Sequence, residues 1–363
     1  MIPISKPLLG EEEQAAVRRV IESGMLAQGP RVAEFERAFA ECIGVNHAIA
    51  TSNGTTALHA ALLAHGVGPG DQVITTPFTF MASVNSILFT GARPVLVDID
   101  DSFNVNPELI EAAITPHTKA IMPVHLYGQP ADLGVIDQIA RQYGLALIED
   151  ACQAHGAEFA GRKAGSYGSG CFSFYATKNM TTGEGGMITT DDEGIAQRAR
   201  MIIAHGMKVR YYHETLGYNY RMTDLAAAIG IEQLKKLPAF NARRAENAAW
   251  YDQHLANIPG LITPSIGPDR THVYHQYTIR ITPEYGLSRD ALVELLGKRG
   301  IGSAIYYPIP VHRQHSMRAY GMGELAFPVT EHMADEVLSI PIHPSVTDSD
   351  RLVIADALIS ARQ

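Results

Sequence analysis

The sequence predicts an α/β protein in which helices cover both faces of a mainly parallel sheet, and a smaller α+β domain follows. Helix and strand patterns alternate over the first two-thirds of the chain. The strand segments are nearly all apolar and lack a regular polar alternation, which is typical of parallel strands buried on both faces. The pattern changes towards the C-terminus, so we predict a large domain over residues 1–236 and a small domain over residues 237–363.

Short elements follow one another in the predicted large domain. A charged helix over 11–23 ends at Gly24, and apolar residues at helical spacing continue over 32–43. The next predicted elements are a strand over 47–51, an Ala- and Leu-rich helix that ends at Gly66, a strand over 72–76, a helix over 80–90, a strand over 93–99, a helix over 107–114, a strand over 119–126, a helix over 132–143 and a strand over 145–150.

The pattern after Asp150 predicts shorter strands and longer helices. Thr223 is expected to cap a helix over 224–236, and Pro238 to begin a second helix that runs to about residue 257. The other predicted elements are a hairpin over 157–165, a strand over 171–176, a Thr- and Gly-rich loop, a strand over 186–190, a strand over 273–281, a helix from Ser288 to Arg299 and a strand over 301–307.

Composition excludes several classes of protein. The formal net charge is −9 and no basic stripe is present, which argues against a nucleic-acid binder. The N-terminus lacks the pattern of a signal peptide, and no apolar run is long enough to span a membrane, so we expect a cytoplasmic protein. Neither a disulfide framework nor a metal site is expected, because the three cysteines are widely spaced: Cys42, Cys152 and Cys171.

A segment of small polar residues, Ser52 to Thr56, lies between a predicted strand and a predicted helix. The free amides at the start of a helix and the helix dipole favour an anion there. Gly54 lets the backbone approach a ligand closely, and the hydroxyl groups add hydrogen-bond donors. The segment therefore indicates either a phosphate site or an ordinary N-terminal cap.

Two charged residues stand at or just beyond the ends of other apolar strands. Asp150 ends one strand, where ligand groups collect in α/β sheets, although it is equally consistent with a capping residue. Lys178 follows another strand and precedes the glycine-rich run 181–186. A half-buried lysine can lose its proton and attack a carbonyl group, whereas most loop lysines are simply solvated.

These features together match the requirements of pyridoxal phosphate (PLP). The cofactor needs a cup for its phosphate, an acid at its ring nitrogen and a lysine for its aldehyde. The sequence supplies them in that order at the ends of different strands: the segment at Ser52, then Asp150, then Lys178. Either Phe78 or Phe80, which follow a further strand, is placed to stack on a flat ring, unless both simply pack at the helix start.

Ordered motifs make the chain resemble the DegT/StrS family of PLP-dependent nucleotide-sugar aminotransferases. This family belongs to the aspartate-aminotransferase group, fold type I. The resemblance extends from Ile4 to about residue 360. The motifs that carry it are Gly29-Pro30 with Phe35-Glu36, Ser52–Ala57, Glu149–Gly156, Phe172–Gly186, Gly217–Asp224 and Tyr307–His312.

The resemblance implies a role for individual residues. Lys178 would form the Schiff base with the cofactor and move protons, and Asp150 would pair with the ring nitrogen. Gln153 would lie near the ring hydroxyl, and Phe80 would stack on the ring. The phosphate would be held by Gly54, Thr55 and Ser173, and by Asn219 from the partner subunit of a homodimer with shared active sites.

The implied reaction moves an amino group from an amino acid, expected to be L-glutamate, to a keto sugar in amino-sugar biosynthesis. The keto group would be at C3 or C4, and the nucleotide would be dTDP, UDP or GDP. Aromatic residues flank Lys208, Arg210 and Arg221. This pattern indicates either that these side chains contact the sugar diphosphate or that they lie in a solvated surface loop. The full set of predicted substrate contacts is His155, Lys208, Arg210, Arg221, Tyr307 and His312.

Two other functions are compatible with the same fold. Some relatives have histidine in place of the lysine and dehydrate the sugar, so Lys178 favours transamination. A non-catalytic sensor or regulator would be expected to have lost Lys178 or Asp150, and both are present. The chain also lacks an added DNA-binding segment or basic tail.

Overall fold

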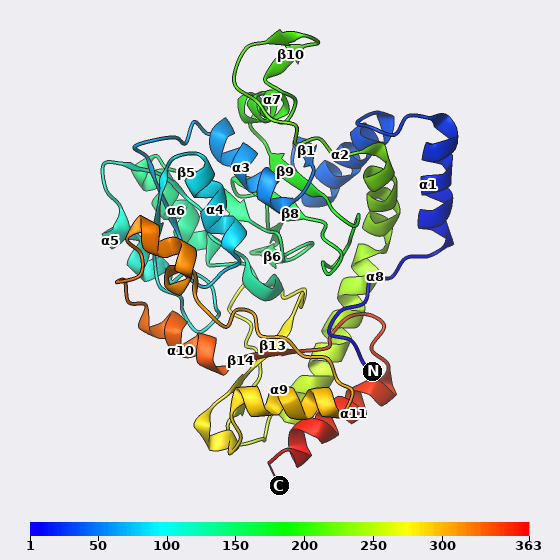
Figure 1. Ribbon diagram of the computed structural model, residues 1–363, viewed down its shortest axis with the longest axis vertical. Helices are drawn as coiled ribbons and strands as arrows, with labels where there is room; N and C mark the ends of the chain where they lie inside the picture. Colours follow the sequence, from blue (N-terminus) through cyan, green and yellow to red (C-terminus); the bar gives the residue numbers. More distant parts are fainter. Residues whose placement is uncertain (363) are drawn as a thin grey trace.

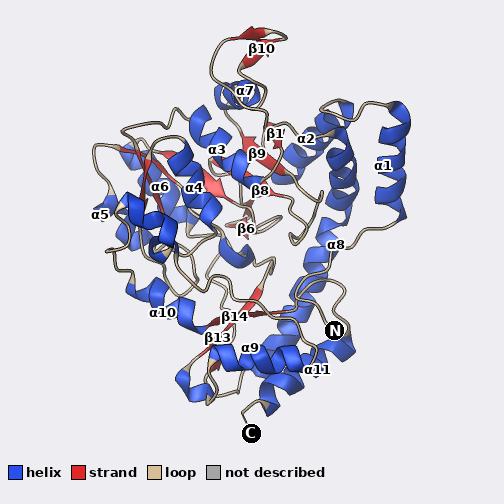
Figure 2. Ribbon diagram, in the orientation of Figure 1, coloured by secondary structure: helices blue, strands red, loops and turns tan. Residues whose placement is uncertain are grey.

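The computed structural model describes residues 1–362 and contains a seven-stranded mixed sheet (Figures 1 and 2). Six strands run in one direction, and β9 is antiparallel to both of its neighbours. This mostly parallel sheet confirms the predicted fold class. The strand order is β1 (His47–Thr51), β9 (Gly186–Thr190), β8 (Ser169–Ser173), β5 (Ala146–Asp150), β4 (Thr118–Ile121), β2 (Gln72–Thr75) and β3 (Arg93–Leu96).

Helices cover both faces of this sheet. Neighbouring residues of a strand face opposite sides, so in β1 the side chain of Ile49 packs with α3 (Gly54–Ala64) and α7 (Glu193–Ile202). Ala50 packs on the other face with α2 (Pro30–Ile43). Burial on both faces explains why the strand sequences are largely apolar. The remaining helices around the sheet are α1 (Glu11–Ser23), α4 (Met81–Phe89), α5 (Ile110–Ala113) and α6 (Leu133–Tyr143).

One continuous helix, α8 (Asp224–Leu255), replaces the two helices predicted around Pro238. Proline inside a helix removes one backbone hydrogen bond, but its φ angle remains compatible with the helix. Packing of α8 against α1, α2 and α11 (Asp348–Ser360) supports the helix along its length. The predicted domain boundary at 236/237 falls within α8 and remains a prediction.

The C-terminal part has its own core below the large sheet in Figure 1. Its antiparallel sheet contains β12 (Leu261–Ile262), β13 (Tyr277–Ile281) and β14 (Val337–Ile340). The strand predicted over 301–307 is wrong: Ile301 and Ala304 form only isolated bridges, with Ile2 and Ser339. Further elements here are α9 (Arg289–Lys298) and α10 (Pro328–Glu336).

Two short hairpins form two-stranded sheets of their own, separate from the main sheet. The predicted hairpin over 157–165 is present as β6 (Glu158–Phe159) and β7 (Arg162–Lys163). A second one, formed by β10 (Met207–Val209) and β11 (Tyr212–His213), projects from the body at the top of Figure 1. None of the described helices has both the length and the apolar character needed to cross a membrane.

Candidate active site

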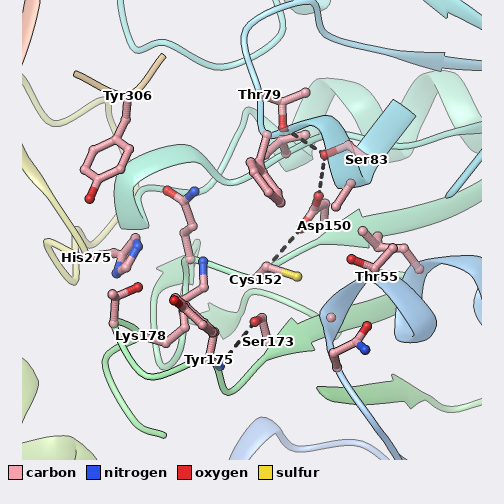
Figure 3. A pocket seen from close by; sticks show the side chains of 18 of the residues that line it. Thr55, Thr79, Ser83, Asp150, Cys152, Ser173, Tyr175, Lys178, His275 and Tyr306 are labelled. Carbon is pink, nitrogen blue, oxygen red and sulfur yellow. Dashed lines mark hydrogen bonds between the residues drawn. The ribbon is translucent and has the colours of Figure 1, made fainter. Parts of the chain in front are cut away.

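A cavity of about 660 Å³ opens at the carboxyl ends of the parallel strands (Figure 3). The loops after β1, β2, β5 and β8 line it, and segments of the C-terminal part complete the wall. Ligand sites of open α/β sheets form at this edge. The structure gathers the following predicted residues in the lining of this cavity: Gly54, Thr55, Phe80, Asp150, Gln153, Ser173, Lys178 and Tyr307.

The start of α3 forms an anion cup. The Asn53 side chain accepts the Thr56 amide at 2.9 Å, and the Asn53 carbonyl accepts the Ala57 amide at 3.1 Å. Among residues 1–362, the amides of Gly54 and Thr55 have no protein acceptor. A Cβ atom at position 54 would lie 2.7 Å from the Ser173 Cβ, so only glycine leaves this space open. Two free amides, the helix dipole and the Ser173 hydroxyl suit a phosphate.

Asp150 presents an oriented carboxylate to the cavity. It is only 5% exposed, and the Ser83 hydroxyl donates to its Oδ2 at 2.7 Å. The Cys152 amide donates to Oδ1 at 3.2 Å, and the Thr79 hydroxyl lies 2.8 Å from that of Ser83. These contacts fix the carboxylate at the end of β5. A buried carboxylate held in this way suits a cationic N–H partner, such as a protonated ring nitrogen.

Gln153 lies beside Asp150 with its amide orientation fixed. Its Oε1 accepts the Tyr127 backbone amide at 2.8 Å, so its NH₂ group faces the cavity. One N–H donates to the Tyr307 hydroxyl at 3.2 Å. Burial raises the pKa of Tyr307, which keeps this phenol protonated. The arrangement offers a hydrogen-bond donor to a ring oxygen.

Lys178 stands in the loop that follows β8. The Lys178 amide donates to the Tyr175 carbonyl at 2.9 Å, and the Thr182 amide donates to the Phe174 carbonyl at 3.0 Å. These bonds fold the loop tightly and hold the half-buried lysine at the cavity. Withdrawal from water lowers the pKa of the amine, while Cys152 and Asp150 act in the opposite direction. A lowered pKa favours the unprotonated, nucleophilic amine.

Aromatic side chains form part of the wall. Phe80 is 58% exposed and lines the cavity, whereas Phe78 is fully buried and packs against Phe103. Of the two aromatics predicted as stacking residues, Phe80 is therefore the one available to a ligand. The Phe80 ring centroid lies 6.1 Å from that of Tyr307.

Several lining residues were not recognised from the sequence. Ser83 lies in α4 and bonds to Asp150, 67 residues further along the chain, and no local pattern marks it. His275 and Gln276 precede β13 in the C-terminal part, far along the chain from the other site residues. The cavity residues missed by the sequence analysis include Thr79, Ser83, Tyr175, Glu184, His275, Gln276 and Tyr306.

Two histidines predicted to contact the substrate are buried and are absent from the cavity lining. His155 packs between Phe172 and Phe174, and burial, together with the nearby charge of Lys178, lowers its pKa to about 3. His312 is fully buried, and its Nε2 lies 2.9 Å from a carboxylate oxygen of Glu331. Neither histidine lines the cavity of this chain.

The remaining predicted contacts lie outside the cavity of this chain. Lys208 and Arg210 are exposed in the segment of the β10–β11 hairpin. Asn219 is also exposed, and its Oδ1 accepts the Arg221 Nε–H at 3.1 Å. The Ser52 amide donates to the Tyr220 carbonyl at 2.7 Å, so this segment is attached to the anion cup of its own chain.

The fold and the cavity define a class of protein. The sheet is mostly parallel, and a lysine and a carboxylate stand at or just beyond its strand ends. This fold and site are those of a type I PLP-dependent aminotransferase. The chain belongs to the DegT/DnrJ/EryC1/StrS aminotransferase family, whose sequence model matches residues 7–359. Solved relatives contain pyridoxamine phosphate, the aminated form of the cofactor.

Individual relatives agree with this assignment. The spore coat polysaccharide biosynthesis protein SpsC of Bacillus subtilis is 42% identical over 366 residues, covering 96% of this chain and 94% of that protein. DesV of S. venezuelae is 39% identical, covers 97% of this chain and 95% of its own, and superposes with a TM-score of 0.93. DesI, solved with its TDP-sugar product, is 32% identical over 100% of this chain and 92% of its own, with a TM-score of 0.92.

Proposed function

We propose that this aminotransferase moves an amino group from L-glutamate to the C3 or C4 keto group of a nucleotide-linked keto-deoxysugar, in amino-sugar biosynthesis. The observation that carries the proposal is the convergence of the Lys178 amine, the Asp150 carboxylate and the anion cup on one cavity. The relationship to DesI, which was solved with a TDP-sugar product, supports a nucleotide sugar as acceptor. The nucleotide would be dTDP, UDP or GDP.

The residues of the cavity suit PLP. When bound, this cofactor supplies an electron-accepting ring that carries an aldehyde. We assign its phosphate to the amides of Gly54 and Thr55 and the hydroxyl of Ser173. Asp150 would hold the proton on the ring nitrogen, and the Gln153 amide would donate to the ring oxygen.

Lys178 supplies the chemistry of this chain. Its unprotonated amine would hold the cofactor through the aldehyde carbon. After the amino donor takes that place, the free Lys178 Nζ would remove the proton from the donor's α-carbon and deliver it to the cofactor carbon. Phe80 would cover the ring and exclude water from the reacting atoms. The same groups act in reverse on the keto sugar, so the two substrates react in turn.

The two half-reactions can be followed separately by absorbance. We expect the purified protein to show a visible band from its lysine-bound cofactor, and L-glutamate to bleach that band. A keto sugar should then restore the band as the sugar gains an amine. The sugars to compare are dTDP-, UDP- and GDP-linked, each with the keto group at C3 or C4.

Each negative result of this experiment has a defined meaning. A protein whose band no amino acid bleaches would contradict transamination and favour a sensor. A sugar that loses a hydroxyl group without gaining an amine would favour a dehydratase.

We further propose a homodimer in which each active site contains residues of both chains. Lys178 is the single lysine or arginine in the cavity lining among the described residues, which is little positive charge for a cofactor phosphate and a sugar diphosphate. Asn219 would complete the phosphate site of the partner, and Lys208, Arg210 and Arg221 would meet the diphosphate. The exposed apolar residues of the β10–β11 region support a contact surface there: Val209, Tyr211, Tyr212 and Leu216.

Subunit mixing tests the shared site. Lys178→Ala chains and Asn219→Asp chains should each be inactive alone, because one lacks the amine and the other repels the phosphate. One site of each mixed dimer would contain wild-type Lys178 and wild-type Asn219. Equal mixing should therefore restore about one quarter of wild-type activity.

Mass measurement of the mixed dimer provides the control for this experiment. If the heterodimer forms and both parents are inactive, absence of any recovered activity means that each site is built from one chain. Asn219 would then cap a turn within its own subunit.

A further inference from the structure

Two neighbouring side chains in the cavity wall are buried without satisfying their hydrogen bonds. His275 and Gln276 are 5% and 4% exposed, and both line the cavity. Within residues 1–362, His275 Nδ1 and Gln276 Oε1 have no hydrogen-bond partner. Most buried polar atoms in folded proteins are paired, because an unpaired one costs free energy. Both residues line the cavity, and no hydrogen bond of either side chain is found within residues 1–362, so the pair is available to a ligand bound there.

Other polar side chains of the segment 272–278 are hydrogen-bonded within the protein. The Tyr274 amide donates to His272 Nδ1 at 2.8 Å. The Tyr277 hydroxyl donates to Asp252 at 2.6 Å, and the hydroxyl groups of Thr278 and Ser339 lie 2.8 Å apart. Polar side chains on either side of the pair are thus satisfied within the protein. Within residues 272–278, the two unpaired side-chain atoms belong to the two residues that line the cavity.

His275 lies beside Lys178, as Figure 3 shows. Burial lowers the pKa of His275 well below its ordinary value, and the charges of Lys178 and Arg244 lower it further. The imidazole is therefore neutral at neutral pH and offers one N–H donor and one acceptor. Gln276 is also neutral and offers both kinds of group. The pair provides hydrogen bonds next to the reactive amine without adding a charge.

We infer that His275 and Gln276 form a neutral subsite that binds the α-carboxylate of the amino donor in one half-reaction and a hydroxyl group of the keto sugar in the other. The inference rests on the function proposed above. In the amino donor, the carboxylate is attached to the carbon that reacts. In the keto sugar, a hydroxyl group is attached to the carbon next to the one that reacts. Each group must therefore lie close to Lys178. No arginine of this chain lines the cavity among the described residues.

A neutral subsite suits two substrates of different charge. A fixed arginine would bind the carboxylate, but it would be left buried and unpaired when the uncharged sugar ring takes its place. Imidazole and amide groups hydrogen-bond to a carboxylate and to a hydroxyl group, and neither substrate leaves a charge uncompensated. One set of side chains can thus serve both steps.

The Gln276→Leu enzyme tests this subsite, because leucine has a similar volume and no polar atoms. We expect the half-saturating concentration of glutamate, read from bleaching of the cofactor band, to rise roughly 10-fold to 100-fold. That of the keto sugar, read from return of the band, should also rise. The melting temperature of the substrate-free holoenzyme should not fall, because the replaced oxygen had no partner.

Gln129→Leu is the matched control. Gln129 is also buried and lies outside the cavity lining, but its amide donates to the Ser265 carbonyl at 3.1 Å and accepts the Gly267 amide at 2.7 Å. This variant should melt at a lower temperature while both half-saturating concentrations stay unchanged. A second variant, Gln276→Glu, keeps the shape and adds a negative charge. It should weaken glutamate binding more than sugar binding.

The outcomes separate this inference from the proposed function. If Gln276→Leu leaves both half-saturating concentrations unchanged, or changes only one, the shared subsite is refuted. The same holds if Gln276→Glu affects both substrates equally. If the wild-type protein shows no bleaching with glutamate, the proposed function itself fails.

Discussion

Replacing Lys178 with alanine is expected to abolish amino transfer from glutamate to a keto sugar while leaving the fold intact. The change removes both the nucleophile and the group that moves the proton. Proton transfer by a positioned side chain alone accounts for a factor of about 10² to 10⁴ in rate, so kcat should fall by at least about 10⁴ when both roles are lost. Steady-state kinetics with glutamate and an accepted keto sugar measure this loss.

Cofactor retention and thermal stability complete this test. The anion cup around Gly54 is unchanged in the Lys178→Ala protein, so we expect this protein to retain PLP without the band of the lysine-bound form. Lys298→Ala, at an exposed position of α9, should match the wild type in both rate and melting temperature. Near-normal turnover by Lys178→Ala would contradict the mechanism.

Asp150→Asn is expected to slow the chemical step by about 100-fold or more, equivalent to roughly 3 kcal/mol of transition-state stabilisation. Asparagine keeps the shape and can still accept the Cys152 amide, which donates to Oδ1 of Asp150 in the native protein. It carries no negative charge, so, given the role proposed for Asp150, it would hold a proton on the ring nitrogen less firmly. The rate of bleaching at saturating glutamate isolates this step.

Asp98→Asn separates this effect from simple loss of a buried carboxylate. Asp98 is 8% exposed and accepts the Thr330 hydroxyl at 2.7 Å, outside the cavity. Its replacement should lower the melting temperature and leave the bleaching rate unchanged. If Asp150→Asn retains full activity, Asp150 serves only as a cap at the end of β5.

Local sequence patterns predicted most of the large domain. The apolar runs that became β1, β2 and β5 were recognised because strands buried on both faces must be apolar. The strand ends then identified Gly54, Asp150 and Lys178 as candidates, because parallel strands deliver their carboxyl ends to one edge. The structure brings these three residues together in one cavity, while the roles assigned to them remain proposals.

Other features depended on contacts between distant segments. Pro238 suggested two helices, but packing on α1, α2 and α11 supports one continuous α8. The 301–307 segment resembled a strand, yet it finds only isolated bridging partners. Local preference is too weak to decide such cases when tertiary packing acts on the same residues.

The sequence alone therefore determined the α/β class, the family resemblance and the residues placed at strand ends. Each of these features depends on residues that are close together in the sequence. Only the tertiary structure decided that Ser83 donates to Asp150, and that His275 and Gln276 face the cavity beside Lys178. The physical reason is that a hydrogen bond or a cavity wall requires groups within a few ångströms of each other. That proximity depends on how α4, the strand ends and the C-terminal part pack together, and it leaves no periodic signal along the chain.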